Sequence, residues 1–334
     1  MKRIVTLLLT LALTVSFAAL PASAQEGTGL KLGLYIHADA ASSKDAADTD
    51  GLAQVDADAV AVLVDADGRI VNLAIDSAQT KMPFTATGAL GANFPTEPKT
   101  KKEMGTEYGM AQVSKVGEWD QQIEAFRRYV IGKTAAEVQG IALDASTKPT
   151  DADLTAGCTM SVGTYVNAVV AAIAAATPVN ASATDTVGLG IVTATDGSKD
   201  AMDGADGLCE AYSTYVAVTL NAAGEVTASR IDSTQGKITF DATGKITSDV
   251  TALFATKQEI GDAYGMKAAS PIGKEWYEQA NAFAAYLIGK TATAVDGIAL
   301  DASTKPTDTD LTASVTISAG DFKAAALKAI ANAQ

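Results

Sequence analysis

Two nearly identical stretches of the chain combine an acidic residue, several hydroxyl side chains and the start of a predicted helix. The first runs from Asp153 through Gly157 to Ser161, and the second runs from Asp310 to Ser318. Hydroxyls directly before a helix can serve as N-caps. The same position can hold a phosphate, because backbone N–H groups and the positive end of the helix dipole meet there. Both interpretations stay open for the hydroxyl residues of the two stretches, which are Thr159, Ser161, Thr316 and Ser318.

The other reactive residues do not form the common catalytic or metal-binding patterns. His37 is the one histidine of the chain, so a Ser/His/Asp triad cannot occur in both stretches, and we expect this histidine at the surface or on an edge strand. Cys158 and Cys209 are too few for a cysteine-ligated cluster, and whether they pair with each other stays open. The Asp-rich segments at 65–68 and 196–206 lack the distal glutamate of a calcium loop, which indicates solvated loops.

The sequence Gly-Lys-Thr occurs at 132–134 and again at 289–291. A phosphate-binding P-loop needs a further glycine five residues before the first of these glycines. The chain has Arg127 and Ala284 at those positions. We therefore interpret each Gly-Lys-Thr as the end of one helix followed by the N-cap of the next.

Charge and composition exclude further classes of protein. The chain has 334 residues, with 39 acidic and 25 basic side chains and a formal net charge of −14. Binding to nucleic acid requires clustered Lys and Arg, so nucleic acid is not an expected partner. Hydrophobic residues make up 48% of the chain, and its length suffices for two ordinary domains, which argues against disorder of the whole protein.

The first 24 residues predict export. Lys2 and Arg3 precede an uncharged apolar run over 4–20, and residues 22–24 read Ala-Ser-Ala, the small-x-small pattern of a signal-peptide cleavage site. A membrane span would not carry a cleavage site directly behind it. We expect the mature chain to be secreted and extracytoplasmic, in the periplasm or at the cell surface, without a transmembrane anchor.

The chain contains an internal repeat of domain size. The segment Gly140–Ala156 returns as Gly297–Ala313 with one substitution, at an offset of 297 − 140 = 157 residues. This period is far longer than that of solenoid repeats and indicates tandem duplication. We define the first copy as residues 25–176 and the second copy as residues 187–334, joined by a polar linker at 177–186.

Each copy predicts an antiparallel hairpin followed by helices. In the first copy, apolar residues alternate over 60–64 and 71–75 around a turn at 65–68, which predicts a half-buried pair of strands. Apolar residues then fall at helical spacing before Gly132, and again after Ser161. The inward residues of these two helices are expected to be Trp119, Ile123, Phe126 and Val130, and then Val166, Val169, Val170 and Ile173. The predicted class is α+β, with two tandem homologous domains that each pack helices on an antiparallel-rich sheet.

The repeated stretch resembles the FMN-binding domain of the flavin-carrying subunits of Rnf-type and sodium-pumping NADH:quinone reductase complexes. The shared order is an acidic residue, a cluster of small and hydroxyl residues, a threonine six residues after the acid, and an amphipathic helix. In that family a flavin transferase esterifies the FMN phosphate onto the motif threonine. The resemblance implies FMN on Thr159 and Thr316, with Asp153 and Asp310 as the motif acids, and Gly157 makes the first copy the better match.

The surroundings of the motif resemble that family as well. A Tyr-Gly segment with Tyr108 in the first copy and Tyr264 in the second lies where the family has its glycine-rich loop facing the flavin. The resemblance implies that these tyrosines shield the flavin ring and that Ser161 and Ser318 belong to the sites. The implied function is electron transfer by a redox carrier, with a flavin transferase and a redox protein as partners, and two flavins in tandem would extend the redox path.

A different class of function stays open beside the flavin carrier. Ala156 and Ala313 stand where the family usually has a hydroxyl residue, and aromatic residues make up only 6% of the chain. Both features favour an extracytoplasmic surface or ligand-binding protein that kept the fold without the cofactor.

Overall fold

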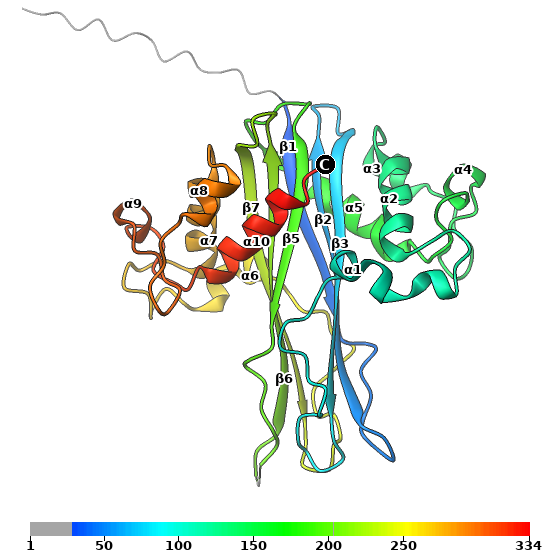
Figure 1. Ribbon diagram of the computed structural model, residues 1–334, viewed down its shortest axis with the longest axis vertical. Helices are drawn as coiled ribbons and strands as arrows, with labels where there is room; N and C mark the ends of the chain where they lie inside the picture. The colour runs from blue at the N-terminus through cyan, green and yellow to red at the C-terminus, as the bar shows by residue number, and fades with distance from the viewer. Residues whose placement is uncertain (1–28, 203) are drawn as a thin grey trace, which may run out of the picture.

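Two antiparallel sheets lie face to face at the centre of the protein, and helices cover their outer faces (Figure 1). The structure is a computed structural model that describes residues 29–202 and 204–334, and the predicted export signal lies outside these residues. The predicted α+β class is confirmed, because each sheet is followed in the chain by the helices that cover it.

The sheet of the first copy has the strand order β3-β2-β1-β4, and that of the second copy has the order β5-β6-β7. The predicted hairpins are confirmed, with Val60 opposite Ile75 across the first hairpin. Part of the predicted linker forms β4, which pairs with Lys31 and Leu32 of β1. The strands are β1 (Lys31–Asp39), β2 (Gly51–Val64), β3 (Ile70–Phe84), β4 (Thr177–Pro178), β5 (Thr186–Ala194), β6 (Gly207–Leu220) and β7 (Val226–Phe240).

The helices of the two copies follow the same order along the chain. The first copy has α1 (Lys101–Met104), α2 (Trp119–Val130), α3 (Ala135–Gln139), α4 (Ala152–Thr155) and α5 (Gly163–Ala174), with short 3-10 helices η1 (Gly105–Tyr108) and η2 (Met110–Gln112). The second copy has α6 (Lys257–Ile260), η3 (Gly261–Tyr264), α7 (Trp276–Leu287), α8 (Ala292–Asp296), α9 (Thr309–Thr312) and α10 (Gly320–Ala331).

The predicted helix α2 is confirmed in its buried face and in its end. Its four predicted inward residues are all buried, and Gly132 follows it with a left-handed φ of 81°. Thr134 then caps α3, as the interpretation of Gly-Lys-Thr requires. In α5 the prediction is correct for Val166 and Val169, whereas Val170 and Ile173 are only half-buried. The inward face of α5 is completed by Tyr165 and by small alanines, because the helix lies very close to the sheet.

The prediction of half-buried strands is wrong, because both faces of the central strands are buried. Val60 and Val62 of β2 face the helices of the first copy. Ala59 and Ala61, which alternate with them, face the sheet of the second copy. Small apolar side chains let two sheets approach closely, so an alanine that looks neutral in the sequence forms part of a second core.

The two copies share this central core. Leu189 and Tyr215 of the second copy pack with the inner alanines of the first. Further along the strands, the rings of Phe84 and Phe240 stack with their centroids 4.5 Å apart. The predicted division into two separate domains therefore stays a prediction, because much of the buried surface of each sheet lies against the other.

Glycines let one helix of each copy lie directly on its sheet. A Cβ atom on Gly33 of β1 would stand 1.9 Å from the carbonyl oxygen of Ala172 in α5, and Gly188 of β5 meets Ala329 of α10 at the same distance. Only glycine allows this approach. It fixes the position of α5 and α10, and thereby the segments that precede them.

Candidate functional site

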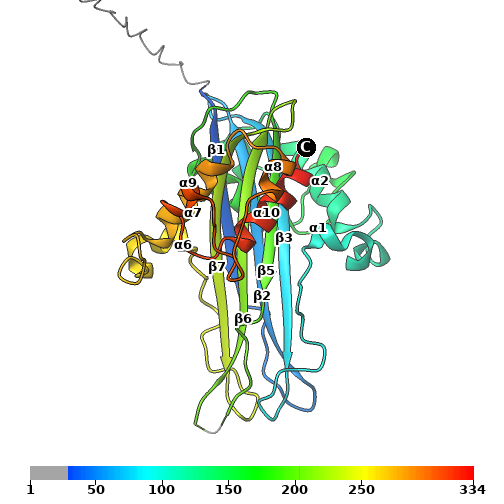
Figure 2. The ribbon, with the colours of Figure 1, turned by 60° about the vertical axis from the view of Figure 1, so that its left-hand side comes forward.

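The two candidate stretches lie on opposite flanks of the protein. The first connects α4 to α5 and the second connects α9 to α10. In Figure 1, α4 and α9 stand at opposite sides, with both sheets between them. Figure 2 shows the same separation for the preceding helices, α1 and α2 on one side and α6 and α7 on the other.

A buried glutamine holds the segment that contains Thr159. Gln122 of α2 is fully buried. Its Oε1 accepts hydrogen bonds from the backbone N–H of Thr159 at 3.0 Å and of Met160 at 3.1 Å, and from Thr159 Oγ1 at 3.4 Å. Its Nε2 donates to the carbonyl oxygen of Gly117 at 2.9 Å. The backbone of this segment is thus fixed to α2, while the side chain of Thr159 is exposed.

The second copy repeats this arrangement. Gln279 of α7 is fully buried, and its Oε1 accepts from the backbone N–H of Thr316 at 2.9 Å and from Thr316 Oγ1 at 3.3 Å. Thr316 is half-buried. Sequence reasoning missed both glutamines. The available indication was a polar residue three positions after Trp119 and three after Trp276, on the face of each helix that the apolar spacing turns inward.

The motif hydroxyls do not cap the helices that follow them, so the capping interpretation is wrong. The N-caps of α5 and α10 are Val162 and Ala319, and neither helix has a side-chain cap. The Ser161 hydroxyl instead bonds to that of Thr147, which has a left-handed φ of 57°. In the second copy, Ser318 bonds to Thr304 in the same way.

The motif acids lie at the surface beside another aromatic residue. Asp153 is exposed on α4, directly after the N-cap Asp151. Burial raises the pKa of Tyr129, and the charges of both aspartates raise it further. Asp310 of α9 stands in the same relation to Tyr286. The structure therefore places Asp153 near the end of α2 and Asp310 near the end of α7. Gly157 lies close to Ala125 of α2.

The two predicted tyrosines turn their rings toward lysines. Lys101 Nζ lies 5.3 Å from the ring centroid of Tyr108 and 5.6 Å from that of Trp119. Lys257 Nζ lies 4.5 Å from the centroid of Tyr264. Sequence reasoning did not select either lysine, because each is an ordinary first residue of a short helix.

A cavity of about 380 Å³ opens beside Thr316. Its walls combine two lysines, two aromatic rings and the motif hydroxyls. Burial, together with the charge of Lys237, lowers the pKa of Lys257 to about 8. The lining residues include Tyr212, Lys257, Trp276, Lys305, Thr316 and Ser318.

Trp119 and Trp276 are buried, as expected of helix anchors, with 1% and 2% of their surface exposed. Trp276 additionally forms part of the wall of this cavity.

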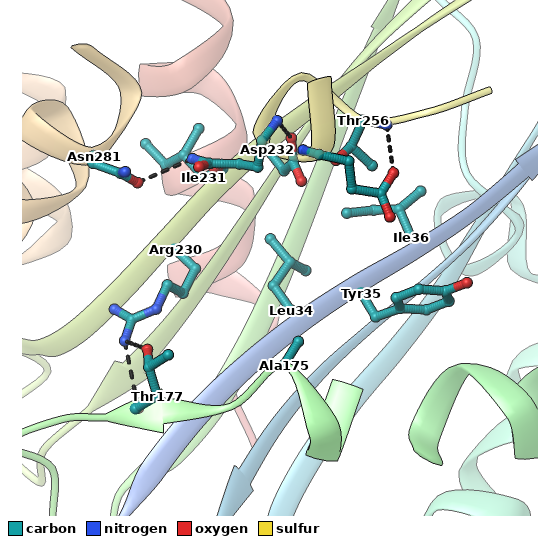
Figure 3. Close-up of a pocket in the computed structure, with 12 residues that line it drawn as sticks. Leu34, Tyr35, Ile36, Ala175, Thr177, Arg230, Ile231, Asp232, Thr256 and Asn281 are labelled. Atoms are coloured by element: carbon teal, nitrogen blue, oxygen red, sulfur yellow. Dashed lines mark hydrogen bonds between the residues drawn. The ribbon is translucent and has the colours of Figure 1, made fainter. Parts of the chain in front are cut away.

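A separate cavity of about 450 Å³ lies between the two copies (Figure 3). Its polar side chains pair with one another. Arg230 Nη2 donates to Thr177 Oγ1 at 2.6 Å, and Gln258 Nε2 donates to Asn281 Oδ1 at 3.0 Å. These contacts join β4 to β7 and α6 to α7, so we assign this cavity a structural role.

Both cysteines are free thiols in the interior. Cys158 and Cys209 are buried in different core clusters. Burial raises the pKa of Cys158 to about 11 and that of Cys209 to about 12. His37 lies on β1, where its Nε2 is 3.4 Å from Asp39 Oδ2, in agreement with a partly exposed strand residue.

Comparisons with known proteins give one short similarity. The chain is 58% identical over 40 residues to a chlorophenol reductase of Desulfitobacterium hafniense. The matched segment makes up 12% of this chain and 12% of that relative. No protein-family model matches the chain. No solved structure matches it. Within residues 29–202 and 204–334, no helix has the length and apolar character needed to cross a membrane.

Proposed function

We propose that the protein is an exported electron-transfer protein that carries FMN esterified to Thr159 and Thr316. The observation that supports this most directly is the cavity beside Thr316, which brings together aromatic rings, cationic side chains and a threonine hydroxyl. Its volume of about 380 Å³ lies within the range of small-molecule sites.

The chemistry of the cavity suits FMN. An isoalloxazine ring is flat and apolar on its faces, so it suits a wall formed by Trp276 and Tyr212. The phosphate is anionic, and Lys257 and Lys305 supply positive charge. The helix α10 begins four residues after Thr316 without a side-chain cap, which favours an anion at its N-terminus. When bound, FMN would supply the redox chemistry.

The chain itself would position the cofactor. Gln122 and Gln279 accept hydrogen bonds from the backbone N–H groups of the motif threonines, so that each hydroxyl stands at a defined place. Thr159 is exposed, which suits attack by a modifying enzyme from solution. The proposed partners are therefore a flavin transferase and a redox protein.

The opposite placement of the two sites changes the expected redox path. Sheets in a sandwich are about 10 Å apart and a helix adds a layer about 10 Å thick on each side. Two flavins separated by these layers are poorly placed for direct exchange with each other. We propose that each site exchanges electrons with a partner on its own flank, independently of the other site.

The short similarity to a chlorophenol reductase agrees with a role in reduction, since that relative is named as a reductase. The proposal takes no substrate from it. The second candidate, a cofactor-free ligand-binding protein, is favoured by the preformed cavity itself, which could hold a non-covalent aromatic anion.

Alanine variants of the motif threonines test the proposal. The protein would be produced in an exporting host together with a flavin transferase, and covalent flavin would be measured by in-gel fluorescence. Thr159→Ala and Thr316→Ala should each remove one of two flavins, and the double variant should remove both. Thr155→Ala and Thr312→Ala are matched controls on the preceding helices and should keep both flavins. A wild-type protein without covalent flavin would contradict the proposal and favour the cofactor-free ligand-binding protein.

A further inference from the structure

The two candidate flavin sites differ in their charges, and this inference rests on the proposed function. Lys257 of the second copy is only 4% exposed. Its Nζ lies 4.4 Å from the ring centroid of Tyr212, 4.5 Å from that of Tyr264 and 5.1 Å from that of Trp276. It also donates a hydrogen bond to Tyr212 Oη at 2.8 Å. Three rings thus enclose one cation at the wall of the cavity.

The first copy has a weaker enclosure. Lys101 takes the equivalent position and is half-buried, and its nearest rings are at 5.3 and 5.6 Å. The sheet register places Asp56 opposite Gln79, where the second copy places Tyr212 opposite Gln235. Asp56 of the first copy therefore takes the position that Tyr212 has in the second copy.

A second carboxylate of the first copy lies close to Lys101. Asp58 stands opposite Ser77, and the second copy has the neutral Thr214 opposite Ser233. Burial raises the pKa of Asp58, while a hydrogen bond from Ser77 and the positive charge of Lys101 lower it. Lys101 therefore lies near a buried carboxyl group at a position where the second copy has the neutral Thr214.

Hydrogen bonds hold Asp58 beneath the tryptophan of the first copy. Ser77 Oγ lies 2.5 Å from Asp58 Oδ1 and 2.9 Å from Tyr165 Oη. Trp119 Nε1 donates to the same Tyr165 Oη at 3.2 Å. In the second copy, Phe322 packs edge-on against Trp276 with centroids 5.6 Å apart, and Ser233 bonds at 3.1 Å to the neutral Thr214 instead of to a carboxyl group.

Two carboxylates near Lys257, Glu210 and Asp232, raise its pKa against the effect of burial, but each of them has other partners. Lys237 and Glu210 form an ion pair with each other at 3.4 Å. Asp232 accepts hydrogen bonds from the backbone N–H groups of Ser233 and Gln258. Lys257 makes no ion pair among the residues that the structure describes.

We propose that Lys257 sets the reduction potential of the flavin at Thr316, and that this potential is higher than that of the flavin at Thr159. Uptake of two electrons and one proton leaves one net negative charge on the flavin. A fixed cation in a partly water-excluded site stabilises that charge. In the first copy, Asp56 and Asp58 oppose the same effect.

Single-site proteins separate the two potentials. Thr159→Ala leaves only the site of the second copy, and Thr316→Ala leaves only that of the first. Flavin content is measured by intact mass, and each potential by spectroscopic titration with dithionite as reductant and the buffer as proton source. At a fixed potential near the midpoints, we expect the ratio of reduced to oxidised flavin to be about tenfold higher in the second copy, equivalent to about 30 mV for a two-electron couple.

Two substitutions test the cause of this difference. Lys257→Met keeps most of the side-chain volume and should lower the potential of the second site, while the matched Lys101→Met should change the first site less. Asp58→Asn retains an acceptor for Ser77 and should raise the potential of the first site, so the inference does not depend on one variant. Equal potentials in flavin-loaded proteins, or no response to both Lys257→Met and Asp58→Asn, would overturn it while the proposed function stands. Absence of flavin from both single-site proteins would overturn the proposed function and this inference together.

Discussion

At the scale of single residues, two buried glutamines position the candidate site. Gln122 and Gln279 each accept hydrogen bonds from the motif segment through one amide oxygen and donate through the nitrogen to a loop on the other side. Each therefore joins two loops that the hydrophobic core alone would not fix.

Replacement of these glutamines should act on one site at a time. Gln122→Leu removes the acceptor for the N–H groups of Thr159 and Met160, which should cost about 1–3 kcal/mol of stability. It should reduce flavin on Thr159 and leave that on Thr316 unchanged. Gln279→Leu is the reciprocal control, and equal loss at both sites in either variant would contradict a local positioning role. Denaturant titration and intact mass measure the two effects.

Two buried aspartates predict a dependence of stability on pH. Burial raises the pKa of Asp76 and of Asp232 from 3.8 to about 6, against the opposing effect of their hydrogen bonds. Between these values the folded state binds more protons than the unfolded state, so the free energy of unfolding should fall as the pH rises from 4 to 6. Each group should contribute about 2–3 kcal/mol to this fall.

Asparagine at the two positions tests the pH effect. Asp76→Asn and Asp232→Asn keep an oxygen that can accept the same backbone hydrogen bonds, and they remove the titration. The slope of stability against pH should flatten in each variant and most in the double variant. An unchanged slope, measured by denaturant titration across pH 4 to 6, would show that other groups are responsible.

At the scale of elements, the sequence predicted the hairpins and α2 because their apolar spacing is regular. It did not reveal which face of each strand is more deeply packed, since the alanines of β2 gain their partner only from the other copy. The three rings that enclose Lys257 were not predicted, for a similar reason. Its rings come from β6, η3 and α7, which are separated in the chain and meet only in the fold.

The close approach of α10 to β5 gives an element-scale prediction. Gly188→Ala would place a Cβ atom 1.9 Å from the carbonyl oxygen of Ala329, so α10 must move away from the sheet. We expect a loss of about 2–4 kcal/mol, comparable with severe overpacking. The matched Gly297→Ala meets its nearest atom at 3.4 Å and should cost less than about 1 kcal/mol. Thermal unfolding of both variants measures these losses of stability. Equal losses in the two variants would contradict the close contact between α10 and β5.

At the scale of the whole molecule, the repeat in the sequence suggests two independent units, whereas the structure joins them through a common core. The rings of Phe84 and Phe240 stack across this core. In addition, Lys328 Nζ of α10 forms an ion pair with Glu103 Oε1 of the first copy, at 2.5 Å. The sequence alone could not show this, because residues that face another copy have the same apolar pattern as residues that face a local helix.

The shared core predicts one cooperative unfolding transition. Calorimetry of the mature chain should show a single transition whose van't Hoff and calorimetric enthalpies agree. Phe84→Ala should lower the stability by about 3–5 kcal/mol and keep the single transition. Two resolved transitions in the unaltered chain would instead indicate copies that fold independently.

The central claim, that this chain carries flavin on two opposite flanks, is tested most directly by the intact mass of the mature protein produced with and without a flavin transferase. The account predicts a transferase-dependent increase equal to two FMN units, assigned by peptide mapping to Thr159 and Thr316. A mass that equals the unmodified chain under both conditions, in a protein that also fails to bind added FMN, would contradict it.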